Sequence, residues 1–233
     1  CIRDRMNVGW LGKENVAPRV ILTEGGSMTD IYVYNQLTKD NNGNIKVDQN
    51  GNLGITSSNT PVKVGNLDAD FNLGWTNHFT YKGIDLGVVL SARVGGLAYS
   101  ATQGILDYYG VSETSATARD NGGIPINNGK VNAQKYYQTI GTGEGGYGRY
   151  YLYSATNVRL QELSLNYTLP KRWFKNVANV TLGIVGRNLW MIYCKAPFDP
   201  ELSASTSSNY YMNVDYFMQP SLRNFGFNVK VQF

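Results

Sequence analysis

The 233-residue sequence predicts an all-β protein whose antiparallel strands form part of a transmembrane β-barrel. Three observations support this fold class: strict alternation of apolar and polar residues, short connections on one side of the strands with long ones on the other, and a composition rich in turn and strand residues. Charged residues make up only 16% of the chain, against roughly 25% in soluble domains, while there are 26 Gly and 17 Tyr.

The clearest alternation lies in a predicted hairpin. Odd positions in residues 71–81 are mostly large and apolar, whereas even positions are small or polar. After a tight turn at Lys82 and Gly83, the even positions of residues 84–94 carry the apolar side chains. We therefore expect a β-hairpin with one apolar face.

A second hairpin is predicted from about Ser154 to Trp190, with a short turn at 170–176. Its apolar positions change parity inside the first strand. Such a change requires one extra residue, so we expect a β-bulge near residues 161–162. The last strand alternates over residues 225–233 and ends on an aromatic residue.

The connections between these strands differ in length. Two are short turns, whereas residues 95–153 and 194–220 are long, Gly-rich and Tyr-rich. Outer-membrane barrels have short periplasmic turns and longer extracellular loops. We therefore expect residues 67–233 to be barrel strands with two long extracellular loops. Residues 1–66 are expected to be a loop-rich segment on the extracellular side, with short strands near 20–22 and 31–34.

The charged residues of the predicted strands all fall on the polar face: Asp85, Arg93, Arg159, Glu162, Arg187 and Lys230. In a barrel these side chains would line the aqueous lumen. At the lipid-facing midplane an Arg or Lys would cost about 2–4 kcal/mol. The apolar face is accordingly expected to contact outer-membrane lipid.

Six tyrosines in the long loops are candidates for contact with a substrate or a partner protein: Tyr108, Tyr109, Tyr136, Tyr137, Tyr210 and Tyr211. Exposed aromatic side chains can stack on sugar faces or anchor a partner. Packing of the loops against one another explains these residues equally well. Both interpretations stay open.

The sequence offers little for an enzyme or a cofactor. His78 is the only histidine, and with two distant cysteines it supplies neither a usual zinc ligand set nor a convincing catalytic triad. The Gly-rich segment 141–148 lacks the Gly-Lys-Ser/Thr end of a phosphate-binding loop, and we expect a flexible loop there. The net charge of +4 is scattered. We therefore expect no enzymatic activity, no cofactor and no nucleic-acid partner.

Two pairs of carboxylates are weak candidates for calcium ligands: Asp68 with Asp70, and Asp199 with Glu201. Calcium is bound by oxygen ligands, which such pairs can supply. Shaping of the junctions between loops and strands is the preferred explanation. No metal site is therefore predicted.

Ordered blocks of the sequence resemble the SusC/RagA family of TonB-linked outer-membrane proteins. The blocks are residues 65–71, 79–86, 158–170, 186–190 and 196–201, followed by the aromatic terminal strand. Together they extend over residues 65–233. The order and spacing of the blocks carry the resemblance, more than any single block.

The resemblance implies a 22-stranded barrel of which this chain is the C-terminal sector, because the five clear strands are fewer than the eight of the smallest single-chain barrels. It implies import of oligosaccharides or peptides across the outer membrane of a Gram-negative bacterium of the Bacteroidetes type. The implied partners are a SusD-like surface lipoprotein that acts as a lid, and TonB, reached through an N-terminal part missing from this chain. The alternative is a soluble, secreted β-sandwich that binds carbohydrate through its loop tyrosines.

Overall fold

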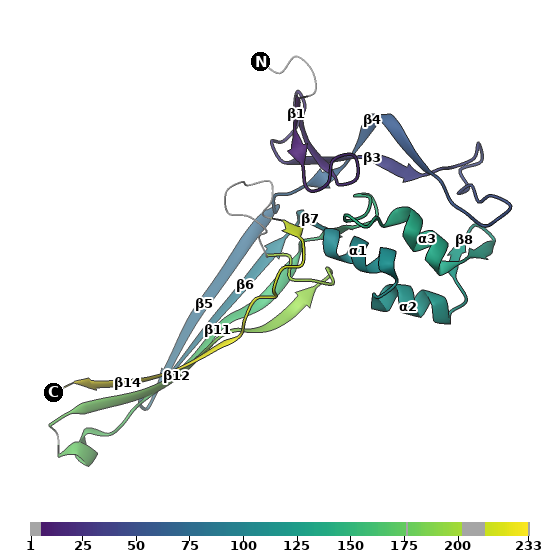
Figure 1. The fold of residues 1–233 in the computed structure, drawn as a ribbon. Helices are drawn as coiled ribbons and strands as arrows, with labels where there is room; N and C mark the ends of the chain where they lie inside the picture. The colour runs from purple at the N-terminus through teal and green to yellow at the C-terminus, as the bar shows by residue number, and fades with distance from the viewer. Residues whose placement is uncertain (1–5, 176, 202–212, 233) are drawn as a thin grey trace. The chain divides into compact units, whose positions relative to one another are not determined.

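The computed structural model describes residues 6–175, 177–201 and 213–232 (Figure 1). The chain divides into two compact units. Unit 1 comprises residues 1–68, 96–154 and 200–218, and unit 2 comprises residues 69–95, 155–199 and 219–233. None of the helices in the described ranges is long and apolar enough to cross a membrane.

Unit 2 is one antiparallel sheet of five long strands in the order β14-β12-β11-β6-β5 (Figure 1). The strands are β5 (Phe71–Tyr81), β6 (Ile84–Val94), β11 (Asn157–Thr168), β12 (Asn179–Cys194) and β14 (Asn224–Gln232). The five strands expected from the alternation of residues are thus present and lie in one sheet.

Both predicted hairpins are confirmed. β5 and β6 pair along their whole length and are joined by Lys82 and Gly83, whose φ angles of 46° and 83° suit the tight turns of twisted hairpins. β11 and β12 form the second hairpin, and the predicted bulge lies between Leu160 and Glu162. A 3₁₀ turn, η1 (Lys171–Phe174), lies within the short connection between them.

One face of this sheet is apolar and exposed. Leu73, Trp75 and Phe227 have exposed fractions of 59%, 48% and 69%. A soluble β-sandwich would bury such a face against a second sheet. The exposure of these side chains is what a lipid-facing surface requires and counts against the sandwich alternative.

Unit 1 combines small sheets with three short helices. A four-stranded sheet contains β1 (Met6–Trp10), β2 (Arg19–Leu22), β3 (Asp30–Leu37) and β4 (Ile55–Asn66). The short strands are β7 (Leu97–Ser100), β8 (Ile124–Ile126), β9 (Gly129–Val131), β10 (Leu152–Ser154) and β13 (Val214–Asp215). The helices are α1 (Ala101–Tyr109), α2 (Glu113–Asp120) and α3 (Ala133–Ile140). β2 and β3 confirm the short strands expected near 20–22 and 31–34.

The long connection expected at 95–153 contains these three helices, which the sequence analysis did not predict. Each helix has a side-chain cap at its N-terminus. The caps are Ser100, Ser112 and Asn132, whose side-chain oxygens accept from backbone N–H groups of the first turn. Together with Gly110, which ends α1 in the left-handed conformation, these caps give each short helix defined ends.

The core of unit 1 joins segments that are far apart in the sequence. Leu11, Val20 and Ile31 from the first segment share one apolar cluster with Tyr99 and Tyr151 from the second. The predicted boundary after residue 66 lies near the end of the first segment at Asp68. Residues 1–68 are nevertheless not separate from the long connections, because they fold together with them.

Candidate functional site

The candidate contact tyrosines lie on two helices of unit 1. Tyr108 and Tyr109 end α1, and Tyr136 and Tyr137 lie within α3. In each pair the rings meet edge to face, with centroids 5.1 Å and 5.2 Å apart. Edge-to-face contact fixes the direction of aromatic rings. Tyr210 and Tyr211, the other two candidates, lie outside the described residues.

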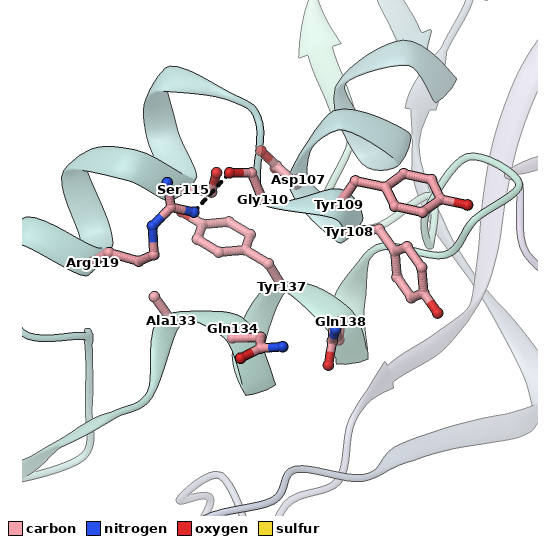
Figure 2. Close-up of a pocket in the computed structure, with 10 residues that line it drawn as sticks. All are labelled: Asp107, Tyr108, Tyr109, Gly110, Ser115, Arg119, Ala133, Gln134, Tyr137 and Gln138. Atoms are coloured by element: carbon pink, nitrogen blue, oxygen red, sulfur yellow. Dashed lines mark hydrogen bonds between the residues drawn. The ribbon is translucent and has the colours of Figure 1, made fainter.

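Three of these tyrosines line one pocket, which α1, α2 and α3 enclose (Figure 2). Its volume is about 210 Å³. The principal lining side chains are Tyr108, Tyr109, Arg119, Gln134, Tyr137 and Gln138. Tyr136 does not line the pocket and packs instead against the core of unit 1.

Asp107 lies at the wall of this pocket and is 4% exposed. Its Oδ1 accepts hydrogen bonds from Gln103 Nε2 at 2.9 Å and Thr114 Oγ1 at 2.9 Å, and also from the Ser112 hydroxyl. Buried carboxylates require such donors to offset the loss of water. The network ties the end of α1 to the start of α2 and so fixes one side of the pocket.

The other polar groups of the pocket come from α2 and α3. One guanidinium nitrogen of Arg119 donates to the carbonyl of Gly110 at 2.7 Å (Figure 2). Gln134 and Gln138 are exposed and lie one helical turn apart, on the same side of α3. Within the described part of the chain their side-chain amides make no hydrogen bond, so they are available to a ligand.

The tyrosines of α3 stay protonated at neutral pH. Burial raises the pKa of Tyr137, with a further contribution from the nearby Asp107 carboxylate. Burial also raises the pKa of Tyr136 to about 12. A protonated phenol both donates and accepts hydrogen bonds. Tyr137 therefore adds to the pocket a hydroxyl that can both donate and accept a hydrogen bond.

In unit 2 the six predicted lumen residues lie on one face of the sheet: Asp85, Arg93, Arg159, Glu162, Arg187 and Lys230. Residues directly opposed in an antiparallel sheet point to the same side. Glu162 opposes Arg187, and their side chains form an ion pair of 2.8 Å. Arg187 in turn opposes Asn224 on β14. Lys230 is six positions after Asn224, so its side chain points to the same side of the sheet. The polar face is therefore continuous from β6 to β14.

Arg159 differs from the other five because it is buried. Its guanidinium contacts Asp199 at 2.6 Å, and the two side chains are only 4% and 7% exposed. It also donates to Asn188 Oδ1 at 2.7 Å and to Ser221 Oγ at 3.2 Å. This network joins β11 and β12 to the segments that follow β12 and precede β14.

Asn188 takes part in the network through an unusual backbone conformation. Its φ of 53° lies in the left-handed region, which Asn tolerates better than most residues. It lies at a register irregularity of β12, between Arg187 and Trp190. From there its amide also donates to the carbonyl of Leu222 at 3.2 Å. The sequence block at 186–190 thus has a specific local structure.

The weak calcium candidates have protein partners. Asp68 accepts from Thr29 Oγ1 at 2.7 Å, and Asp199 binds Arg159. The backbone N–H of Asp70 donates to the Val94 carbonyl at 2.8 Å, at the start of β5. Among the described residues there is no group of three or more His, Cys, Asp or Glu side chains that could hold a metal ion. The carboxylates of Asp68 and Asp199 thus bind other side chains of the chain.

No protein-family model matches the chain. A TonB-dependent receptor, P3, from Formosa agariphila is 26% identical to it over 201 residues. The match covers 83% of this chain and 19% of the receptor. The chain therefore spans about a fifth of the length of the curated relative that it matches.

Solved structures of RagAB, which are described as a peptide transporter or importer, have the same fold. One matches with a TM-score of 0.55 and 16% identity, over 87% of this chain and 22% of that chain. A second, in a closed-closed state, matches with a TM-score of 0.50 and 18% identity, over 97% and 22% of the two chains. These comparisons confirm the resemblance to the SusC/RagA family: the chain is similar in sequence to a TonB-dependent receptor and has the fold of part of the RagAB chain.

Proposed function

We propose that this chain is the C-terminal sector of an outer-membrane nutrient importer, whose sheet in unit 2 forms part of the barrel wall. The observation that carries this proposal is the division of the sheet into two faces. One face is apolar and exposed, and the other holds all six charged strand residues. A sheet between lipid and an aqueous lumen needs this division, because charge is costly only on the lipid side.

The edges of the sheet fit a larger closed barrel. Within the described residues β5 and β14 each pair with one strand only, so each has a free edge. Membrane barrels have no free edges, since backbone groups in lipid must be paired. Further strands of the whole protein would pair with both, up to the 22 strands that the family resemblance implies.

The whole protein would import its substrate in the manner of its relatives. The substrate is an oligosaccharide or a peptide, a SusD-like surface lipoprotein covers the extracellular mouth, and TonB supplies the energy through an upstream part of the protein. In this arrangement the lumen residues of unit 2 line the path. The tyrosine-lined pocket of unit 1 contacts the substrate or the lid, on the extracellular side.

The intact mass of the native polypeptide tests this proposal. The protein would be extracted in detergent from outer membranes and purified with an antibody to this sequence. Its intact mass and the masses of the proteins that co-purify with it would then be measured. A chain several times larger than 25.8 kDa, accompanied by a lipoprotein, is expected. A chain near 25.8 kDa that is soluble without detergent would contradict the proposal and return the carbohydrate-binding sandwich to consideration.

A further inference from the structure

We infer that the end of the unit 2 sheet that carries its two short turns binds the headgroup of an anionic phospholipid. This inference rests on the proposed function, in which the short turns lie on the periplasmic side of the barrel, beside the phospholipid leaflet of the outer membrane. It adds the chemistry of one lipid partner to that function. The observations are the charge of the two turns, their aromatic residues and the backbone conformation of two lysines.

The two short turns lie next to each other at one end of the sheet (Figure 1). The first joins β5 to β6 through Lys82 and Gly83, and the second is the connection between β11 and β12 that contains η1. A backbone hydrogen bond joins the two: the N–H of Thr168, the last residue of β11, donates to the carbonyl of Gly83 at 2.7 Å. Both turns are therefore close enough to face the same stretch of membrane surface.

Four cations gather on these two turns. They are exposed residues: Lys82 on the first turn, and Lys171, Arg172 and Lys175 on the second. The described part of this end of the sheet comprises residues 80–85, 167–175, 177–181 and 229–232, and within it Asp85 is the only acidic residue. Asp85 lies on the polar face and accepts from Thr80 Oγ1 at 3.0 Å. The turns therefore offer an excess of positive charge, which suits a phosphate group.

Exposed aromatic side chains accompany the cations. Tyr81 and Trp173 are 67% and 66% exposed. Tyr81 opposes Ile84 on the apolar face, and the ammonium of Lys82 lies over its ring, 5.1 Å from the centroid. Tyr and Trp prefer the headgroup level of a membrane, where one end of the side chain is in apolar surroundings and the other is in water. In the proposed barrel wall, Tyr81 thus holds the Lys82 ammonium at the level of the lipid phosphates.

The conformation of the turns does not explain the lysines at positions 82 and 175. Their φ angles are 46° and 52°, in the left-handed region that glycine and asparagine adopt most readily. Backbone geometry alone would favour one of those two residues at each position. Lysine at both positions indicates that its charge is used, since its backbone is less favourable there.

The headgroup that fits these turns best has a net negative charge. Phosphatidylethanolamine also has a phosphate, but the four cations would repel its ammonium group. Phosphatidylglycerol combines the phosphate with neutral hydroxyls, so its headgroup avoids this repulsion. The planar guanidinium of Arg172 can bind two phosphate oxygens at once, whereas the lysines act as point charges beside it. The turns should therefore prefer phosphatidylglycerol to phosphatidylethanolamine.

Native mass spectrometry of the full-length protein, purified in detergent, tests the inference. The probe is an equimolar mixture of phosphatidylglycerol and phosphatidylethanolamine with identical acyl chains, added as mixed micelles in dilute ammonium acetate. The first lipid retained by the wild-type protein should be predominantly phosphatidylglycerol. The double variant Lys171→Gln with Arg172→Gln should lower the ratio of the two bound lipids about 5-fold, the usual effect of one cation near an anionic lipid surface. More concentrated ammonium acetate should lower the wild-type ratio too, because salt screens exposed charges.

The double variant Lys195→Gln with Arg223→Gln is the matched control. It removes the same charge from exposed residues of unit 2 that lie away from the short turns, after β12 and before β14. It should leave the ratio of bound lipids unchanged. The inference is overturned if the wild-type protein binds both lipids equally, or if the two double variants lower the ratio alike. Either result leaves the outer-membrane importer standing, because that proposal is tested by mass and co-purification.

Discussion

Arg159 shows how one residue can lie on the polar face without presenting charge to water. Its guanidinium contacts Asp199, Asn188 and Ser221, and only 4% of its side chain is exposed. Because both charges of the pair are buried, either one alone would be costly. The pair and its hydrogen bonds therefore hold the segments after β12 and before β14 against the sheet.

Arg159→Met should destabilise unit 2 by about 3–5 kcal/mol, because it leaves the Asp199 carboxylate buried without its cation. The urea midpoint for folding of the full-length protein into lipid vesicles would measure the loss. Arg187→Gln is the control: its ion pair with Glu162 is exposed, at 67% and 32%, and should contribute less than about 1 kcal/mol. Equal losses in the two variants would contradict a special role for Arg159.

The sequence predicted the face of Arg159 but not its partner. Period-two alternation assigns a residue to one side of a strand, and it did so for all six charged residues. It cannot predict that Asp199, forty positions later, folds back onto Arg159. Asp199 was accordingly expected to shape a junction between a loop and a strand, with calcium binding as a weak alternative, and no ion pair was predicted. The αL conformation of Asn188, which directs its amide to the guanidinium, is likewise not visible in a pattern of polarity.

At the scale of elements, the Gly-rich segment 141–148 packs closely against α1. Gly141, Gly145 and Gly146 are buried, and a methyl group on Gly104 would overlap the carbonyl oxygen of Gly145. Tyr99 adds a hydrogen bond of 2.6 Å to the Gly146 carbonyl. The segment was expected to be a flexible loop. Its glycines instead allow backbone and helix to approach, which is the other common use of glycine.

Gly104→Ala should therefore destabilise unit 1 although alanine favours helices. The gain in helix propensity is about 0.5–1 kcal/mol, whereas forcing backbone segments apart in a packed region costs about 1–3 kcal/mol. Gly129→Ala is the control, because a methyl group there meets no atom within 4 Å. Faster limited proteolysis within 141–148 of the Gly104 variant alone is expected. Unchanged cleavage in both variants would show that the close approach is unimportant.

The strands of unit 2 could be predicted from the sequence and the helices of unit 1 could not, and this has a physical reason. The strands of unit 2 form a sheet with one apolar and one polar face, so their apolar and polar residues alternate strictly. The helices of unit 1 are short and depend on their caps and on packing. α1, for example, buries Ala101, Gly104 and Asp107, a set with little hydrophobic contrast. The pocket that the helices form depends on their meeting in space, which no local pattern predicts.

At the scale of the whole molecule, the two units differ in whether their large apolar side chains are buried or exposed. Unit 1 has a buried core built from three separate stretches of the chain. Unit 2 has no comparable core among its described residues and exposes its large apolar side chains on one face. A single sheet of this kind is unstable in water, because its apolar face gains nothing from folding there. In the proposed barrel wall, lipid on one side and closure of the barrel would supply its stability.

Two adjacent residues of β6 test this assignment of faces. Leu90 opposes Trp75 on the apolar face, whereas Val89 opposes Thr76 and Glu162 on the polar face. Leu90→Arg should therefore cost about 2–4 kcal/mol if it lies near the membrane midplane, and Val89→Arg should cost much less, since it places a cation in the lumen beside Glu162. The measurement is the yield of folded full-length protein in the outer membrane, together with its urea midpoint in vesicles. Both residues are aliphatic and lie on one strand, so loss of packing at the wild-type side chain is similar in the two variants. If both arginines were tolerated equally, the apolar face would not face lipid and the barrel wall would have to be assigned elsewhere.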